Sequence, residues 1–188
     1  MRVLLAVAPP RRTQVKMPDL GLGYLATALR NAGHEVCLFQ GETDETPDRF
    51  MQAVEIFQPE LLGLKVFSLE IASVRDAMEA VRKRFPDIRQ VLGGPHISIM
   101  ETGDFESMFP HMDFAIRGEG EIPLPMLADA LENQRRTCRK NHENNENNEN
   151  HENHDNHESR TRDDTVETWQ TAGTVHFRDI PGIVFKDT

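Results

Sequence analysis

The amino-acid sequence predicts an α/β domain, a doubly wound five-stranded parallel sheet, over residues 1–133. Two observations lead to this fold class. Short, almost continuously apolar runs alternate with longer stretches in which apolar residues recur at helical spacing. Runs of the first kind are typical of strands that a parallel sheet buries on both faces, and their alternation with helices produces right-handed βαβ units. The predicted architecture is flavodoxin-like, a Rossmann-like sheet.

Five apolar runs supply the predicted strands. The first is broken by Pro9-Pro10, and the fourth ends at Gly93-Gly94. In chain order, the strands are residues 2–8, 35–39, 61–67, 89–92 and 113–116.

The stretches between these strands, and the one after the last, carry helical patterns. The most regular helix has Ile71, Val74, Met78 and Val81 on one face and ends before Pro86. The predicted helices cover residues 22–32, 47–57, 71–85, 104–109 and 124–133.

A low-complexity segment follows the predicted domain. Residues 141–158 repeat a unit of Asn, Glu and His, with six acidic groups and no Lys or Arg. This composition buries too little apolar area to offset chain entropy, so residues 134–165 are predicted to be a disordered linker. The alternative is a metal site, but no scaffold or thiolate accompanies the histidines. These are His142, His151, His154 and His157.

The last segment, residues 166–188, is predicted to form one or two short strands. Val175–Phe177 and Ile183–Phe185 flank a turn at Pro181-Gly182. Because two short strands are marginal alone, they must pack on the main domain or on a domain that lies beyond this chain.

Charge and cysteine content exclude several classes of protein. The net charge is −10, and leaving out the six acids of residues 141–158 makes it −4, so no nucleic-acid partner is expected. No apolar run is long enough to cross a membrane, and the first one is too short for a signal peptide. Cys37 and Cys138 form neither a disulfide framework nor a metal-binding spacing. We expect a cytoplasmic protein.

The loops after strands one, three, four and five meet at the carboxyl edge of such a sheet, where doubly wound folds bind ligands. These loops are residues 9–21, 65–70, 93–98 and 117–121, and they are rich in glycine and polar residues. Gly93-Gly94 is the strongest signal, since glycine permits a close approach of ligand to backbone. The alternative is a tight turn that binds nothing.

Two ligand classes can be compared with these loops. Gly21–Ala26 matches the dinucleotide-binding pattern G-x-G-x-x-A, but the pattern should directly follow the first strand, and Pro9 to Leu20 intervene. A dinucleotide-binding domain therefore stays a lesser alternative. A phosphoacceptor receiver domain needs acidic residues after strand one and an aspartate after strand three. Ala8-Pro9-Pro10 and Lys65-Val66-Phe67 exclude it.

Glycines also follow strand five, in Arg117–Glu121, where a helix N-terminus is the simpler interpretation. Together with Gly93-Gly94 they would leave a shallow slot for a large flat ligand with a tail. No Ser-His-Asp set, Cys-His pair or carboxylate pair can be drawn at this edge, so no catalytic residue is predicted.

Five stretches together resemble the N-terminal cobalamin-binding domain of cobalamin-dependent radical SAM enzymes, in particular the magnesium-protoporphyrin ester cyclase-like group. They occur in the family's order over about residues 1–128. The stretches are Pro18–Ala26, Gly33–Val36, Leu62–Phe67, Leu92–His96 and Arg117–Glu121. The tail Asp179–Phe185 is similar to the segment that leads into the radical SAM domain.

The resemblance implies a cobalamin cofactor at the carboxyl edge of the sheet. No histidine lies between Pro9 and Asp19, so the implied binding is base-off, without a protein histidine on cobalt. Lys65 stands where the family usually has serine. The implied cofactor-binding residues are Leu20, Gly21, Lys65, Val66, Phe67, Ser68, Gly93, Gly94, Pro95, His96, Arg117, Gly118, Glu119 and Gly120.

The resemblance also implies a longer parent enzyme. Radical SAM chemistry needs C-x-x-x-C-x-x-C to hold an iron–sulfur cluster that binds S-adenosylmethionine, and this chain lacks the motif. The cluster, S-adenosylmethionine and the reaction, methyl transfer or oxidative cyclisation, are thus expected of the parent alone. The alternative from another class is a non-catalytic protein-interaction domain.

Overall fold

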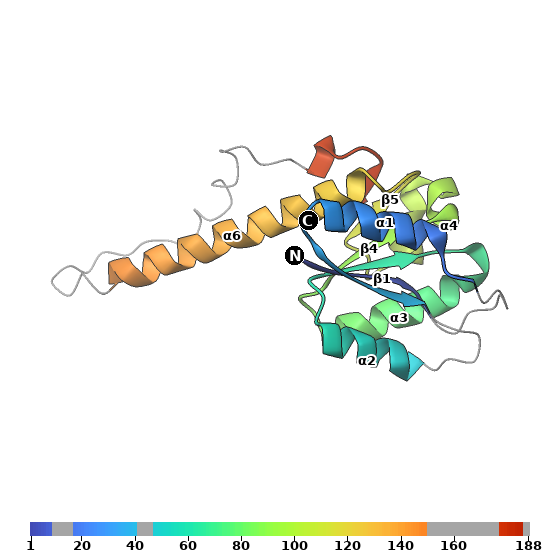
Figure 1. Cartoon of the computed structure of the whole chain (residues 1–188), viewed down its shortest axis with the longest axis horizontal. Helices are drawn as coiled ribbons and strands as arrows, with labels where there is room; N and C mark the ends of the chain where they lie inside the picture. Colours follow the sequence, from blue (N-terminus) through green and yellow to red (C-terminus); the bar gives the residue numbers. More distant parts are fainter. Residues whose placement is uncertain (9–16, 41–46, 150–176, 186–188) are drawn as a thin grey trace.

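The computed structural model describes residues 1–8, 17–40, 47–149 and 177–185 (Figure 1). Its strands are β1 (Arg2–Val7), β2 (Glu35–Gln40), β3 (Leu61–Lys65), β4 (Arg89–Gly93), β5 (Phe114–Ile116) and β6 (Ile183–Phe185). They form one sheet in the order β2-β1-β3-β4-β5-β6, in which β1 to β5 are parallel and β6 is antiparallel to β5. The predicted flavodoxin-like fold is confirmed, but the strand count of five is wrong by one.

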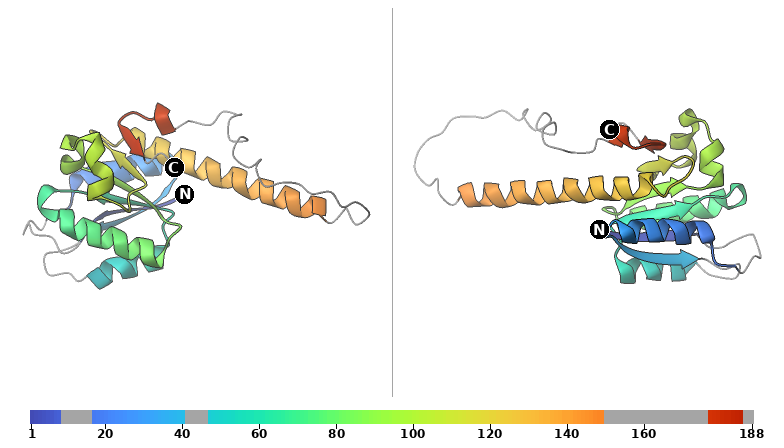
Figure 2. Two further views of the ribbon diagram at one scale, coloured as in Figure 1. Left: turned by 180° about the vertical axis from the view of Figure 1, so that it is seen from behind. Right: turned by 45° about the horizontal axis from the view of Figure 1, so that its top comes forward.

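Helices cover both faces of the sheet (Figure 1, and from behind in Figure 2). They are α1 (Leu20–Asn31), α2 (Pro47–Phe57), α3 (Ile71–Arg84), α4 (Pro95–Ile99), α5 (Phe105–Met108) and α6 (Pro123–Glu149). One core lies between the sheet and α1 with α6, and the other between the sheet and α2 with α3. The predicted helices are all present, whereas α4, only five residues long, was too short to show a helical pattern.

Strand β1 shows why the apolar runs become strands. Successive side chains of a strand point to opposite faces. Accordingly, Val3, Leu5 and Val7 belong to the core beneath α1 and α6. Leu4 and Ala6 belong to the core on the other face, and none of these five side chains is more than 1% exposed.

Helix α6 is longer than the sequence predicts. We expect it to end at 133, but it continues to Glu149 and projects away from the domain (Figure 1). Gln134, Arg135 and Arg136 are strong helix formers, and Arg136 pairs with Glu132 one turn earlier at 2.7 Å. Residues 134–149, assigned to the linker by the sequence, are therefore helical here. Residues 150–165 lie outside the described residues, so the linker stays a prediction.

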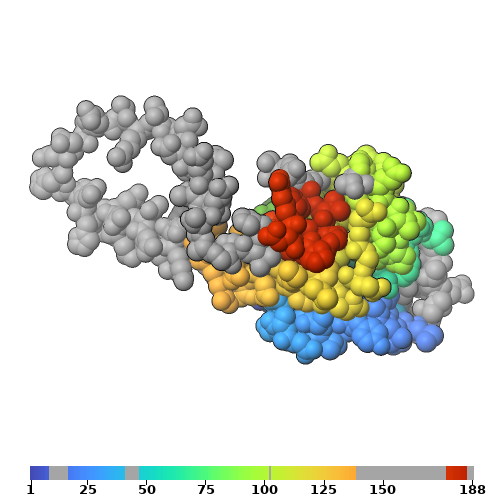
Figure 3. Space-filling model, turned by 90° about the horizontal axis from the view of Figure 1, so that it is seen from above, coloured from blue at the N-terminus to red at the C-terminus, as the bar shows by residue number. Residues whose placement is uncertain are grey.

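The C-terminal segment packs on the main domain. Strand β6 pairs with β5 in the register Phe114↔Phe185 to Ile116↔Ile183, and the buried Ile180 joins the core under α1 and α6. Figure 3 shows this segment, in red, seated on the yellow region that holds β5 and the start of α6. The predicted strand at Ile183–Phe185 is confirmed. Phe177 lies in a 3-10 turn (Phe177–Asp179) instead, and 175–176 lie outside the described residues.

No helix within the described ranges combines the length and the apolar character needed to cross a membrane.

Candidate functional site

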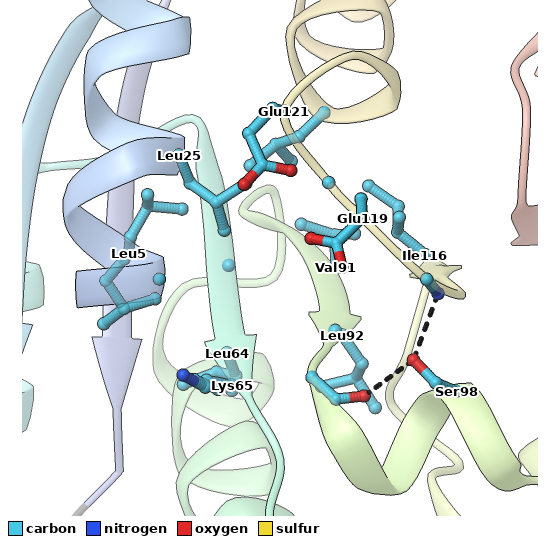
Figure 4. Close-up of a pocket in the computed structure, with 18 of the residues that line it drawn as sticks. Leu5, Leu25, Leu64, Lys65, Val91, Leu92, Ser98, Ile116, Glu119 and Glu121 are labelled. Carbon is cyan, nitrogen blue, oxygen red and sulfur yellow. Dashed lines mark hydrogen bonds between the residues drawn. The ribbon is translucent and has the colours of Figure 1, made fainter. Parts of the chain in front are cut away.

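A cavity of about 450 Å³ opens at the carboxyl edge of the sheet, on the face that α1 and α6 cover. Figure 4 shows it between α1 on one side and β5 with its following loop on the other, above β3 and β4. We call this cavity the α1/α6 groove.

Glycines form the floor of the groove. Gly63 lies inside β3 and Gly93 ends β4, with Lys65 paired to Gly93 in the register. A Cβ on Gly63 would lie 2.7 Å from Leu5 Cδ2, while one on Gly93 would meet only the Ile116 carbonyl oxygen, at 3.9 Å. Because no side chain rises from these two positions, the surface of the sheet is hollowed between α1 and α6.

Apolar side chains form the walls. Leu22 and Leu25 come from α1, and Leu124 comes from the first turn of α6. Gly120 lets the β5–α6 loop pass close to α1, since a Cβ there would lie 2.8 Å from Leu25 Cδ2. The groove is therefore bounded by α1 on one side and by the β5–α6 loop with the first turn of α6 on the other.

The mouth of the groove depends on Gly94. Its φ of 103° is strongly disfavoured for residues with a side chain, and a Cβ there would lie 3.1 Å from both the nitrogen and the carbonyl oxygen of Val66. Around it, Val66 N–H donates to the Gly93 carbonyl at 2.8 Å, and His96 N–H donates to the Val66 carbonyl at 3.2 Å. These bonds hold the ends of β3 and β4 together, which requires glycine at 94.

Ser98 joins the loops after β4 and β5. Its hydroxyl donates to the Gly94 carbonyl at 3.1 Å and accepts from the Gly118 N–H at 3.0 Å (Figure 4, dashed lines). One side chain thus sets the spacing of two loops that line the groove.

Lys65 and Asp19 form an ion pair at the mouth. Lys65 Nζ lies 2.8 Å from each carboxylate oxygen of Asp19, and the two side chains are 21% and 9% exposed. Asp19 caps α1 by accepting from the Leu22 N–H at 3.0 Å, which is why the helix begins at Leu20. The pair therefore connects β3 to the start of α1.

Two carboxylates line the α1/α6 groove away from Lys65. Glu119 and Glu121 come from the β5–α6 loop, and among the described lining residues Lys65 is the only cation. Figure 4 shows Lys65 and Glu121 at opposite ends of the groove. The groove thus combines an apolar interior with the Lys65–Asp19 ion pair at one end and two carboxylates elsewhere.

The groove brings together eight of the fourteen residues predicted to bind a cofactor. These are Gly21, Lys65, Gly93, Gly94, Pro95, Gly118, Glu119 and Gly120. The other six do not line it: they are Leu20, Val66, Phe67, Ser68, His96 and Arg117.

The structure gives several of these six residues other contacts. The Phe67 ring lies under Lys65 Nζ, 5.0 Å from the ring centre, and the Ser68 hydroxyl is 3.1 Å from His96 Nδ1. Arg117 donates through its backbone N–H to the Gly182 carbonyl at 2.9 Å. Cofactor contact by any of the fourteen residues stays a prediction.

The interior lining was missed by the sequence analysis. Leu5, Gly63, Val91 and Ile116 lie within the strands, whereas the prediction took residues only from the loops and strand ends. The alternation of side chains along a strand could have identified these residues. Gly93 lies two residues beyond Val91, so the two face the same side of the sheet, and Gly63 faces that side together with Leu5.

The described residues contain no group of three or more His, Cys, Asp or Glu side chains placed to hold a metal ion. The histidine repeat that raised this alternative lies outside the described side chains. The mainly apolar lining of the groove, with charged groups at its ends, suits a partly apolar ligand.

Comparisons with known proteins point to one ligand class. The family model described as the B12 binding domain matches residues 11–128. An uncharacterized methyltransferase of Pyrococcus horikoshii is 28% identical over 72% of this chain and 30% of its own length. The anaerobic magnesium-protoporphyrin IX monomethyl ester cyclase of Synechocystis sp. is 31% identical over 71% of this chain and 28% of its own. The chain thus spans less than a third of these curated relatives.

Solved structures share the fold. The cobalamin-dependent S-adenosylmethionine radical enzyme OxsB, with aqua-cobalamin and S-adenosylmethionine bound, superposes with a TM-score of 0.59 at 18% identity, over 70% of this chain and 18% of that one. The methanol:cobalamin methyltransferase complex MtaBC from Methanosarcina barkeri gives 0.52 at 21% identity, over 69% of this chain and 45% of that one.

The family match covers more than half of the chain and includes β3, β4, β5 and the loops that line the α1/α6 groove. It confirms the resemblance predicted from the sequence, and cobalamin, the predicted cofactor, is the ligand for which the family is named. This chain belongs to the B12-binding domain family.

Proposed function

We propose that this chain is the cobalamin-binding module of a larger radical SAM enzyme and that the α1/α6 groove receives the nucleotide tail of base-off cobalamin. The observation that carries the proposal is the glycine floor. Gly63 and Gly93 leave a hollow over two neighbouring strands, at the sheet edge where this fold class binds ligands.

The residues present fit this cofactor. Cobalamin joins a broad corrin ring to a slender nucleotide tail. A Cβ at Gly93 would project into the groove with no atom nearer than 3.9 Å, so glycine there leaves open the space that the tail would take. Leu5, Leu25 and Leu124 would hold the apolar base of the tail, and the corrin would lie over the strand ends near Gly94. When bound, cobalamin supplies a cobalt centre able to carry a methyl group.

The groove, which can receive the base, supports base-off binding, and the sequence of the loop after β1 indicates that no protein side chain replaces the base on cobalt. A protein ligand to cobalt would be a histidine in this loop, and the sequence has none between Pro9 and Asp19. The groove gives the displaced base of the tail a place away from cobalt.

Exposed apolar side chains support a partner domain over the same edge. Leu20, Leu69, Ile99 and Ile122 are 65–75% exposed and come from the segments after β1, β3, β4 and β5. Apolar groups gathered around a site mark a contact surface. We place the missing radical SAM domain there, with the iron–sulfur cluster, S-adenosylmethionine and the methyl transfer or oxidative cyclisation all belonging to the cytoplasmic parent.

The test is an absorbance titration of the purified chain with hydroxocobalamin, followed by desalting. Wild type should retain cobalamin with a base-off spectrum. Gly93→Val should not, because its side chain would enter the groove without a clash: the nearest atom to a Cβ is 3.9 Å away.

Gly103→Val is the matched control. A Cβ there would meet no atom within 4 Å, and Gly103 does not line the groove. Retention by the Gly93 variant would show that the ligand lies elsewhere. A wild type that retains nothing would favour the protein-interaction alternative.

A further inference from the structure

We propose that Lys65 recognises the phosphodiester of the nucleotide tail, so that this chain selects complete corrinoids over corrinoids that lack the tail. The inference rests on the proposed function and adds a residue that determines specificity. It concerns a position where the family resemblance leads us to expect serine and the sequence has lysine instead.

The position of Lys65 favours contact with a ligand. It ends β3 at the mouth of the α1/α6 groove, with its side chain confined between two glycines. A Cβ on Gly94 would lie 3.0 Å from Lys65 Cγ, and one on Gly21 would lie 3.2 Å from Lys65 Nζ. Glycine at both positions makes room for the lysine, so its ammonium lies at the entrance that the tail would pass.

Asp19 fixes this ammonium without using all of its donors. The Asp19 carboxylate is anchored as the cap of α1, and its backbone N–H donates to Gln40 Oε1 at 2.9 Å. An ammonium has three N–H donors, of which Asp19 takes two, at 2.8 Å each. Within the described part of the chain, no other hydrogen-bond acceptor is assigned to Lys65 Nζ, so one donor is left for an incoming oxygen.

Lys65 is the one place in the described lining of the groove where an anion would meet a charged donor, its remaining N–H beside the Asp19 pair. Glu119 and Glu121 line other parts of the groove and would repel a phosphate, while Lys65 is the only cation among the described lining residues. The mouth is partly buried, with the Lys65 side chain 21% exposed, so a charged contact there is stronger than one at the open surface. The tail would therefore enter with its phosphodiester against Lys65 and its base deeper.

A purely structural role for the ion pair is the competing explanation. In that case Lys65 only ties β3 to α1, and its loss would disturb every ligand of the groove equally. The two explanations differ in one respect: a phosphate contact matters only for a corrinoid that carries the phosphate.

The experiment compares hydroxocobalamin with dicyanocobinamide, which lacks the nucleotide tail, on the full chain. Lys65→Met should weaken cobalamin binding about ten- to a hundredfold, the range of a charge-assisted hydrogen bond, and leave cobinamide within about twofold. The affinity of wild type for cobalamin should fall as KCl rises, and this dependence should flatten in Lys65→Met. Lys65→Arg should restore both affinity and salt dependence.

Lys83→Met is the matched control, because Lys83 is 73% exposed and pairs with Glu79 on the opposite side of the sheet, on α3. Equal weakening of both corrinoids by Lys65→Met would overturn the inference in favour of the structural role. Unchanged cobalamin binding would overturn it as well. If wild type binds neither corrinoid, the proposed function fails and the inference falls with it, which the wild-type titration alone reveals.

Discussion

The hydroxyl of Ser98 accepts a hydrogen bond of 3.0 Å from the backbone N–H of Gly118. This contact joins α4 to the loop that precedes α6, and the same hydroxyl donates back to the Gly94 carbonyl. Two loops that are separate in the sequence are thereby held at a fixed spacing across the mouth of the α1/α6 groove. The sequence does not reveal this contact.

Ser98→Ala should loosen this spacing. It removes two hydrogen bonds of about 1 kcal/mol each, and we expect cobalamin retention to fall several-fold with a small loss of stability. The measurement is the titration with hydroxocobalamin together with urea unfolding. Ser107→Ala is the control, since the Ser107 hydroxyl donates to the Asp104 carbonyl at 3.0 Å and neither residue lines the groove. Equal retention by both variants would show that the spacing does not depend on Ser98.

Gly94→Ala should destabilise the fold more than Gly33→Ala. Both glycines have positive φ, 103° and 89°, so both substitutions carry a backbone penalty of about 1–3 kcal/mol. Only at 94 would the new methyl group also press on the backbone of Val66, at 3.1 Å, whereas nothing lies within 4 Å at 33. The difference between the unfolding free energies of the two variants, measured in urea, gives the cost of pressing the new methyl group against the Val66 backbone. Equal losses would show that the end of β3 moves aside freely.

The parts of the fold that the sequence predicted are those with local signals. A strand buried on both faces is an apolar run, as in β1, and an amphipathic helix repeats every three or four residues, as in α3. The pairing of β6 with β5 has no such signal, because the paired residues, Phe114–Ile116 and Ile183–Phe185, are far apart in the sequence. The chain also turns at Gly182, with a φ of 70°, just before β6. Long-range pairing cannot be deduced from the pattern of either strand.

In the candidate site, too, the residues with a local sequence signal could be predicted and the long-range contacts could not. Gly93, Gly94 and Gly118 were found because they follow apolar runs, and the topology then places them at one edge. Gly63 was overlooked, although counting two residues back from Lys65 puts it on the groove side of β3. The Lys65–Asp19 pair lay beyond prediction, since its 2.8 Å contact depends on where α1 begins relative to the end of β3.

Gly182→Ala should release the C-terminal segment from the edge of the sheet. Gly182 has a φ of 70°, and a Cβ there would lie 2.6 Å from the Arg117 carbonyl oxygen. Arg117 N–H donates to the Gly182 carbonyl, so its hydrogen exchange should become faster in the variant, which mass spectrometry can follow. Cobalamin retention should also fall, because Arg117 leads into the loop that lines the groove. Unchanged exchange at Arg117 would contradict this role.

Glu132 should contribute stability that disappears in acid. The N-terminal ammonium of Met1, at 3.0 Å, lowers the pKa of the Glu132 carboxyl, burial opposes this shift, and Arg136 at 2.7 Å adds to it. Because the folded-state pKa lies below the unfolded value of about 4.3, the contribution is complete above that pH and is lost as pH falls through the folded-state pKa.

Glu132→Gln removes this contribution, which should be below about 1 kcal/mol for a partly exposed pair. Urea unfolding at pH 7 should therefore show the variant as the less stable protein, and the difference should shrink as the pH falls below about 4.3. The control is Glu79→Gln, because Glu79 pairs with Lys83 at the open surface, where both side chains are about half exposed or more. A difference that does not shrink in acid would mean that Glu132 stabilises α6 by packing and not by its charge.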